Sequence, residues 1–380
     1  IDTILEMAQL KAEGRLGKII VTGCLTERYR DSVTEELPEV DAILGVGSFG
    51  EIVEAVNAVF EDKPVSLFAD NSAPVDEIPR VVSTGPAWAY LRIAEGCNNF
   101  CAFCAIPYIR GRYRSRKMEN ILEEARDLAA HGVKEIIVIA QDITRYGTDI
   151  YGKRSLAELC RKISEIDGVE WIRLHYTYPD QFDDELIDEI ASNPKIVKYL
   201  DIPIQHINND ILRRMNRHGT GDDIRELFKT LRRRIPDLVL RTSLIAGLPG
   251  EGEAEFEELC AFLREAKIER AGVFPFSPEE GTPAAEMEHC DFEQAQHRAD
   301  LIMDIQERIM DDFAASLVGR TLPVLCTDHD EDGQWIGRSC YDSPDIDGLV
   351  YFSGKGGQGN IVPVNIIAVS DDGNLIGEEE

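Results

Sequence analysis

Three of the nine cysteines lie in one short segment, Glu95–Cys104, whose sequence is EGCNNFCAFC. Cys97, Cys101 and Cys104 follow a C-x3-C-x2-C spacing, and thiolates so spaced can converge on one iron–sulfur cube. Three thiolates ligate three irons and leave the fourth iron without a protein ligand, which is the open position that a catalytic metal centre needs. The segment therefore predicts a 4Fe-4S cluster with one open iron.

Two other interpretations of this cysteine segment remain, a structural zinc site and chance spacing. A structural zinc needs a fourth ligand close by, and the nearest histidine in the sequence is His131. Five further cysteines have no ligand-like spacing, and we expect them to be small buried or half-buried residues in a reducing cytosol. They are Cys160, Cys260, Cys290, Cys326 and Cys340.

The cysteine segment follows the first strand of a repeating pattern of strands and helices. We predict strands near 88–94, 135–140, 170–175, 199–204, 238–246 and 272–276, and helices over 119–130, 156–166, 184–191, 222–233 and 255–266. Six successive units indicate an α/β fold with a partial (βα)6 barrel like that of the TIM fold, in which chemistry lies at the carboxyl ends of the strands. A long helical pattern over 291–317 closes this region.

Different patterns flank the predicted barrel. Residues 1–60 alternate helix and strand and predict a small parallel α/β sheet, whereas periodicity is lost over 61–86, where four prolines lie. These are Pro64, Pro74, Pro79 and Pro86. Short strands near 322–326, 335–339, 349–352 and 361–369 predict a small antiparallel β-barrel. We divide the chain into a partial N-terminal domain (1–70), a linker (71–86), the barrel (87–318) and the β-barrel (319–380).

The numbers of acidic and basic residues indicate which class of partner the chain favours. The chain carries 40 Lys and Arg against 70 Asp and Glu, a formal net charge of −30. Binding to nucleic-acid phosphates needs clustered basic residues, so this chain favours a basic partner. The apolar runs have the length of strands, and no membrane span or signal peptide is predicted. Because the chain opens directly on a helical pattern without a Met, we expect it to begin inside a domain.

Six segments, in chain order, carry a resemblance to a known family. They are KIIVTGCL (18–25), CNNFCAFCAIPYIRGRYRSR (97–116), IAQDITRYG (139–147), YLDIPIQH (199–206), TSLIAGLPGE (242–251) and FSPEEGTPA (276–284). Together they resemble the methylthiotransferases of the radical S-adenosylmethionine superfamily. The segments LDIPIQH, SPEEGTPA and GRSCYDSPDIDG (337–348) resemble the branch that modifies ribosomal protein S-twelve rather than the branch that modifies tRNA. The C-terminal module is similar to a TRAM domain.

The resemblance implies which cysteines bind which cofactor. Cys97, Cys101 and Cys104 would hold the 4Fe-4S cluster whose open iron binds S-adenosylmethionine. Cys24 matches the third of three N-terminal cysteines that ligate a second 4Fe-4S cluster in this family. The other two would lie upstream of Ile1, so we expect one complete cluster in this chain and two in a longer one.

Residues at the strand ends are candidate contacts to S-adenosylmethionine, because ligands of such barrels bind there. The candidates are Gln141, Gln205 and Ile245, joined by Phe103, which the resemblance places beside the adenine. Asp142, His206 and residues 247–251 are further candidates, and for each the alternative is a supporting role in a turn. Five basic residues form either a solvated loop or a positive rim for a carboxylate. They are Arg110, Arg112, Arg114, Arg116 and Lys117.

The activity implied by the resemblance is methylthiolation of the β-carbon of an aspartate in ribosomal protein S-twelve, in the cytoplasm, with flavodoxin or ferredoxin as an electron donor. A tRNA adenosine methylthiotransferase and a non-catalytic iron–sulfur binding module are the alternatives. Residues 319–380 hold three basic residues against twelve acidic ones, which favours a basic protein over stable RNA binding. We expect Asp342, Asp345 and Asp347 at that contact.

Overall fold

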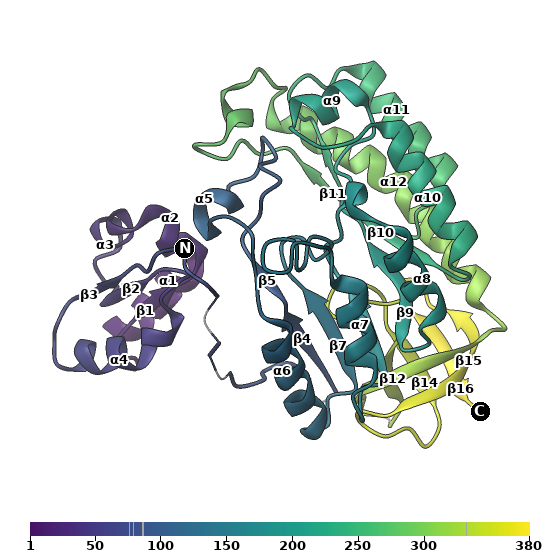
Figure 1. Ribbon diagram of the computed structural model, residues 1–380, viewed down its shortest axis with the longest axis horizontal. Helices are drawn as coiled ribbons and strands as arrows, with labels where there is room; N and C mark the ends of the chain where they lie inside the picture. Colours follow the sequence, from purple (N-terminus) through teal and green to yellow (C-terminus); the bar gives the residue numbers. More distant parts are fainter. Residues whose placement is uncertain (76, 79, 86, 332) are drawn as a thin grey trace. The chain divides into compact units, whose positions relative to one another are not determined.

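The computed structural model describes residues 1–380 except 76, 79, 86 and 332, and the chain forms two compact units (Figure 1). Unit 1 comprises Ile1–Val81, Glu95–Phe100 and Cys104–Arg116, and unit 2 comprises Val82–Ala94, Cys101–Phe103 and Lys117–Glu380. Two of the prolines that predict the linker, Pro79 and Pro86, lie outside the described residues. The division into four domains by residue range stays a prediction.

Unit 1 is built on a parallel three-stranded sheet in the order β1-β2-β3. Its strands are β1 (Ile20–Thr22), β2 (Ala42–Leu44) and β3 (Val65–Leu67). The helices are α1 (Asp2–Ala12), α2 (Cys24–Tyr29), α3 (Asp31–Glu36), α4 (Ile52–Phe60), preceded by a 3-10 turn at Phe49–Glu51, and α5 (Ile106–Arg110). The predicted small parallel sheet is confirmed. Its third strand was not predicted, because Val65–Leu67 lies in the stretch 61–86 where the sequence loses its periodicity.

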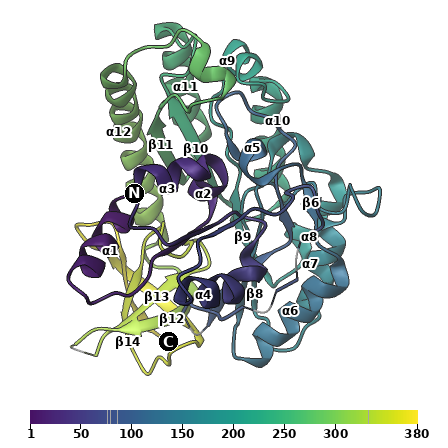
Figure 2. The same ribbon diagram turned by 90° about the vertical axis from the view of Figure 1, so that its left-hand side faces the viewer.

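Unit 2 contains a six-stranded parallel sheet in the order β11-β10-β9-β8-β7-β4, which confirms the partial barrel. The strands are β4 (Trp88–Arg92), β7 (Glu135–Ile139), β8 (Trp171–Leu174), β9 (Ile196–Asp201), β10 (Val239–Ala246) and β11 (Arg270–Pro275). The helices between and after them are α6 (Met118–Ala130), α7 (Leu156–Ser164), α8 (Asp184–Ser192), α9 (Asn209–Arg214), α10 (Gly221–Arg234), α11 (Glu253–Ala266) and α12 (Phe292–Leu317). Of the two-residue strands, β6 (Arg114–Ser115) belongs to unit 1, and β5 (Ala94–Glu95) lies where the chain passes from unit 2 to unit 1. Figure 2 shows the helices on the outer side of this sheet.

Side chains alternate along β10, and this alternation separates a packed face of the sheet from a ligand-facing one. Leu240, Leu244 and Ala246 are fully buried, whereas Arg241 and Ile245 on the opposite face are partly exposed. The face that carries Ile245 is therefore the one open to a ligand.

The fourth sheet strand, β9, lies earlier in the chain than predicted, at Ile196–Asp201 rather than 199–204. Pro203 has no N–H to donate, so the regular ladder stops before it. The chain nevertheless continues beside β10, because the Ile202 N–H donates to the Arg241 carbonyl at 2.8 Å and the Gln205 N–H to the Ser243 carbonyl at 2.9 Å.

The C-terminal module is a closed five-stranded barrel in the order β12-β13-β14-β16-β15. Its strands are β12 (Thr321–His329), β13 (Trp335–Ser339), β14 (Val350–Ser353), β15 (Ile361–Val369) and β16 (Leu375–Glu379). Four pairs are antiparallel, as predicted, and the pair β14–β16 is parallel. The fifth strand, β16, was missed because its acidic end hides the alternation of Leu375 and Gly377.

One hydrophobic core is shared by the six-stranded sheet and the C-terminal barrel. Trp88, Trp171 and Val239 belong to the same buried cluster as Val324 and Phe352 of the barrel. These three sheet residues are the first residues of their strands, so the barrel packs on the amino ends of the sheet. The carboxyl ends, where the cysteine segment follows β4, are left for chemistry.

A buried charge cluster also joins the sheet to the C-terminal barrel. Glu135 at the start of β7 accepts hydrogen bonds from Arg173 on β8, at 2.7 Å, and from Arg338 on β13. All three side chains are at most 3% exposed. Burial raises the pKa of Glu135, but the two arginines outweigh it and the net direction is downward, so this carboxylate is ionised.

The loop after β13 is folded inward, which corrects part of the predicted contact surface. Asp342 pairs with Arg270 at 2.6 Å, and Asp347 accepts a hydrogen bond from the Tyr199 hydroxyl at 2.7 Å. Both aspartates are buried and their charge serves the fold, so the prediction that they meet a partner is wrong. Asp345 is exposed, and its role stays a prediction.

His175, which follows β8, is expected to make the fold sensitive to acid. Burial, and then the charges of Arg173 and Arg241, lower its pKa from about 6.5 to about 3. Between these values the unfolded chain binds a proton that the folded chain does not, so stability should fall by about 1.4 kcal/mol per pH unit as the pH drops below 6.5. Urea unfolding at pH 6.5 and 5.5 should show a smaller loss for His175→Gln. Equal losses in both proteins, or the same effect from the exposed control His131→Gln, would contradict this.

Candidate functional site

The first part of the cysteine segment is a tight loop within unit 1. Gly96 has φ +76°, and a Cβ there would lie 2.3 Å from the Arg112 carbonyl oxygen, so only glycine fits. The Cys97 N–H donates to the Gly111 carbonyl at 3.2 Å, and the Asn98 side chain accepts from the Tyr113 N–H at 3.1 Å. The backbone that presents Cys97 is thus fixed at both ends of its turn.

The middle of the segment, Cys101–Phe103, belongs to unit 2 and is held there by its backbone. The Ala102 N–H donates to the Met215 carbonyl at 2.9 Å, and its carbonyl accepts from the Ala284 N–H at 2.9 Å. Ala102 is also buried in a hydrophobic cluster with Met215 and Ala284. The backbone next to Cys101 is therefore fixed by hydrogen bonds on both sides of Ala102.

Two polar side chains that sequence reasoning did not predict lie against Cys101. Arg217 donates from Nη1 to the Cys101 Sγ at 3.6 Å, and the Tyr178 hydroxyl is 3.9 Å from the same sulfur. The Arg217 guanidinium also lies over the Tyr178 ring, 4.4 Å from its centroid. No spacing rule links residues 101, 178 and 217, so the sequence carried no signal for this cluster.

Three of the four predicted contacts to S-adenosylmethionine are brought together in unit 2. Phe103 and Ile245 both pack, partly buried, against the hydrophobic cluster that holds Ala102. The Ile245 N–H donates to the Gln205 carbonyl at 2.9 Å, and Gln205 has φ +71°, a conformation that non-glycine residues seldom adopt. Such local strain is often found at binding sites.

Gln141, the fourth predicted contact, lies two residues after the end of β7 at Ile139. Its side-chain oxygen Oε1 is buried and has no hydrogen-bond partner. A buried acceptor left unpaired costs about 1–3 kcal/mol, so such an atom marks a place where a ligand donor fits.

The weaker candidates at the strand ends have supporting roles. Asp142 is buried and accepts hydrogen bonds from the Thr144 N–H and from Arg145 Nε, both at 3.0 Å. His206 is 1% exposed, with Nε2 3.2 Å from Glu251 Oε2. The Glu251 carboxylate also accepts from the Gly247 N–H and from Arg298, both at 2.9 Å. These contacts tie the turn after β10 to α12.

Cys24 is the first residue of α2 in unit 1. Arg110 donates to the Cys24 Sγ at 3.3 Å and pairs with Glu95 at 2.5 Å. Burial lowers the pKa of Arg110, but Glu95 and Cys24 outweigh it and the net direction is upward. The guanidinium therefore keeps its charge between these two groups.

Much of the basic stretch after the cysteine segment is used inside unit 1. Arg114 donates to the carbonyls of Asn71, Arg110 and Arg112, and Arg116 forms an ion pair with Glu77. Arg110 is likewise paired with Glu95. These contacts favour a structural role for the basic stretch over a positive rim that binds a carboxylate.

The donor chemistry of the cysteine segment fits an iron–sulfur cluster. The nine cysteines, all within the described residues, form no disulfide bonds; Cys101 is buried, and Cys97 and Cys104 are half-buried. In the part of the chain that the structure describes, no three His, Cys, Asp or Glu side chains are grouped as a metal site. The fit therefore rests on the three thiols of one loop and on the unpaired Gln141 oxygen, rather than on a preformed cage.

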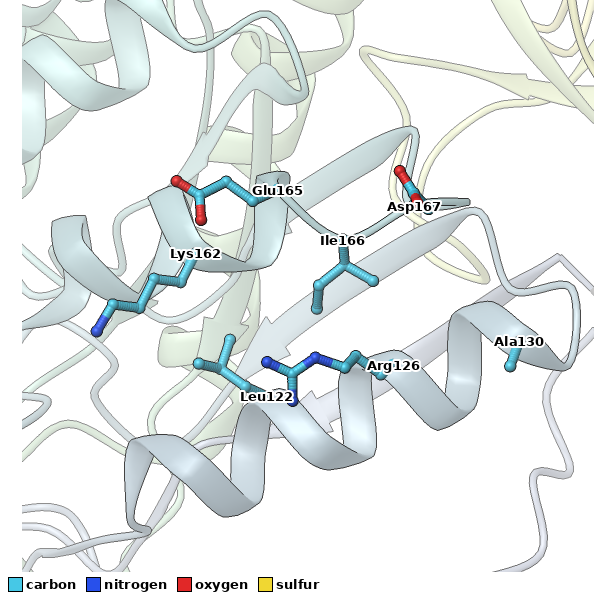
Figure 3. A pocket seen from close by; sticks show the side chains of 7 residues that line it. All are labelled: Leu122, Arg126, Ala130, Lys162, Glu165, Ile166 and Asp167. Carbon is cyan, nitrogen blue, oxygen red and sulfur yellow. The ribbon is translucent and has the colours of Figure 1, made fainter.

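A surface groove of about 660 Å³ lies between α6 and α7, away from all of these residues (Figure 3). It is lined by Leu122, Arg126, Ala130, Lys162, Glu165, Ile166 and Asp167. Its lining mixes both charges and contains none of the predicted site residues.

Comparison with known proteins gives two family matches and several close relatives. Residues 91–263 match the radical SAM superfamily and residues 318–378 match the TRAM domain. The ribosomal protein uS12 methylthiotransferase RimO of Acetivibrio thermocellus is 46% identical over 390 residues, which covers 100% of this chain and 86% of the relative. RimO of Clostridium botulinum is 48% identical over 93% of this chain and 79% of the relative.

Among solved structures, a radical S-adenosylmethionine methyltransferase, TsrM from Kitasatospora setae, with cobalamin and a [4Fe-4S] cluster bound, has a TM-score of 0.56 at 15% identity. The match covers 74% of this chain and 62% of TsrM, and at this identity it shows a shared fold. Among the described residues, no helix is both long and apolar enough to cross a membrane.

Proposed function

This chain belongs to the ribosomal protein uS12 methylthiotransferase (RimO) family of radical S-adenosylmethionine enzymes, and from that premise we propose that it attaches a methylthio group to the β-carbon of an aspartate in uS12. The observation that carries this proposal is the loop after β4 with three cysteines outside any disulfide bond, which has the ligand chemistry of a 4Fe-4S cluster with an open iron.

Cys97, Cys101 and Cys104 would hold this cluster, and Phe103, Gln141, Gln205 and Ile245 would bind S-adenosylmethionine. When bound, the two cofactors supply the one-electron chemistry that removes hydrogen from an unactivated carbon. The chain's own contribution is to orient them. Phe103 and Ile245 offer an apolar surface at the hydrophobic cluster around Ala102, and the Gln141 oxygen offers an acceptor.

Cys24 would ligate a second 4Fe-4S cluster, the source of the transferred sulfur, together with two cysteines upstream. The contact of Arg110 with both Cys24 and Glu95 supports a functional position for this thiol. The proposal is that the present chain holds one complete cluster and that a chain with two more N-terminal cysteines holds two.

Replacing Gln141 by alanine should weaken S-adenosylmethionine binding without destabilising the fold. The variant removes one buried acceptor, and a hydrogen bond worth about 1.4 kcal/mol corresponds to a tenfold rise in Kd. Anaerobic calorimetric titration of the cluster-loaded protein measures this. The control is Gln296→Ala on α12, whose side chain bonds Asp300 at 2.7 Å on the surface. An unchanged Kd for Gln141→Ala would show that Gln141 does not bind S-adenosylmethionine.

The partner that we propose is a basic protein, with no stable RNA binding. The net charge of −30 attracts a substrate rich in Lys and Arg and repels phosphate. In the C-terminal barrel, Arg338 is already paired with Glu135 and Arg320 with Asp237, at 3.0 Å. Electrons would come from a small donor such as flavodoxin or ferredoxin, and the reaction would take place in the cytoplasm with the ribosome.

The test incubates the reconstituted chain anaerobically with S-adenosylmethionine, a reductant, and either uS12 or tRNA. Mass spectrometry then measures 5′-deoxyadenosine and any gain of a methylthio group. The present chain should form 5′-deoxyadenosine only. A chain extended at its N-terminus by the corresponding segment of the Acetivibrio thermocellus relative should also methylthiolate uS12.

Two results would overturn parts of this proposal. Methylthio transfer to tRNA and not to uS12 would show that tRNA is the substrate. Bound iron with no 5′-deoxyadenosine formed would show that the chain is a non-catalytic iron–sulfur binding module. The salt dependence separates the partners further, because uS12 binding should weaken as salt rises.

A further inference from the structure

Arg217 is held beside Cys101 by contacts that do not involve the cysteine. One nitrogen of its guanidinium donates to the Pro203 carbonyl, and the plane of the group lies over the Tyr178 ring at 4.4 Å. The other nitrogen, Nη1, is thereby directed at the Cys101 Sγ, 3.6 Å away. A positive charge is thus fixed at one sulfur of the cysteine segment.

The chemistry of this contact differs from that of a surface ion pair. The contact between Arg217 and the Cys101 sulfur is part-buried, so water and salt screen it less than they screen a pair at the surface. The Tyr178 hydroxyl makes a buried contact of 3.9 Å with the same sulfur, and a ligand thiolate there would accept from it. Both groups are therefore placed to donate to the Cys101 sulfur.

We propose that Arg217 sets the reduction potential of the cluster bound at Cys101, by stabilising the more negative, reduced form. This inference rests on the proposed function, in which Cys101 is a cluster ligand. Hydrogen bonds to cluster sulfurs and nearby charge are the main protein influences on such potentials. Arg217 is a positioning residue, because it acts on the cluster through the Cys101 sulfur.

The direction of the effect follows from the charge. Reduction adds one electron, delivered by the external donor, to the cluster, and a fixed cation beside a ligand sulfur favours the state that has gained it. Removing the cation should make the cluster harder to reduce. A charge-assisted hydrogen bond in a partly buried place is strong enough to change the reduction equilibrium about tenfold, which is 59 mV for a one-electron couple.

The experiment is an anaerobic redox titration of the reconstituted chain, followed by electron paramagnetic resonance without S-adenosylmethionine. Arg217→Met, which removes the charge, should lower the midpoint potential by about 59 mV or more. Arg217→Lys, which keeps the charge, should have a midpoint potential close to that of the wild-type chain. Tyr178→Phe should lower the potential by less than Arg217→Met does. The matched control is Arg213→Met on α9, an exposed arginine paired with Asp210 at 2.8 Å, which should leave the potential unchanged.

The outcomes separate this inference from the proposed function. Wild-type chain without iron after reconstitution would contradict the cluster itself, whereas a loaded Arg217→Met with the wild-type potential would overturn only the role of Arg217. A shift seen solely after S-adenosylmethionine is added would also overturn it, because Arg217 would then contact that ligand. If Arg217→Met fails to retain iron, Arg217→Gln is titrated against Arg217→Lys, and equal potentials would refute the proposal.

Discussion

A chain with Cys97, Cys101 and Cys104 all replaced by alanine is expected to bind no iron–sulfur cluster and to form no detectable 5′-deoxyadenosine. The wild-type chain should hold about four irons after anaerobic reconstitution. The loss should be complete because each thiolate would ligate a different iron, and the alanine side chains offer no replacement donor. Iron and sulfide analysis, visible absorption and 5′-deoxyadenosine formation measure the result.

The control replaces a cysteine that has no place in the cluster. Cys290→Ala removes a half-buried thiol whose sulfur is 3.7 Å from the Gly247 carbonyl, and it should retain the full iron content. Burial raises the pKa of Cys290, so its thiol is a poor iron ligand. Retention of iron by the triple variant, or about eight irons in the present wild-type chain, would refute the assignment.

The second large effect concerns stability, and we expect it from Glu135→Gln. The change leaves Arg173 and Arg338 buried without a counter-charge, and breaking such a buried cluster costs about 3–5 kcal/mol. Urea unfolding of the full chain should show this loss directly. The matched control is Glu170→Gln, which breaks a 3.0 Å pair with Lys134 on the surface and should cost at most about 1 kcal/mol.

A triple variant separates lost charge balance from lost packing. Replacing Glu135, Arg173 and Arg338 together by apolar residues of similar length removes all three charges, and it should recover most of the stability. If Glu135→Gln unfolds at the same urea concentration as Glu170→Gln, the buried cluster does not contribute as we describe.

The sequence was sufficient for the fold where elements are long and periodic. The strand at β7 and the helix α12 are within one residue of their predicted ends, because burial imposes a regular spacing on them. Two short elements were not predicted, for physical reasons: β3 lies in the proline-containing stretch 61–86 that has no periodicity, and α9 begins with a cap from the Asn208 side chain rather than with a hydrophobic period. At β9, Pro203 moved the strand end.

The residues of the candidate site also differ in whether the sequence alone could suggest them. The sequence could suggest the three cysteines as cluster ligands because their spacing lies within one loop, and this prediction needs no contact between distant segments. The environment of Cys101 was not identifiable, because Arg217 and Tyr178 reach it only through the fold. The aspartates of the loop after β13 were misassigned for a related reason: Arg270 on β11, far away in sequence, draws Asp342 inward.

The core that the C-terminal barrel shares with the sheet has a consequence for synthesis of the protein. The nascent chain emerges from its amino end, so the strands that begin with Trp88, Trp171 and Val239 leave the ribosome before Val324 and Phe352. Until the barrel strands follow, the amino ends of the sheet present bare aromatic surface, and the Glu135–Arg173 pair lacks Arg338. Such transient exposure makes a growing chain prone to aggregate. Folding of unit 2 should therefore finish only after the last barrel strand has emerged.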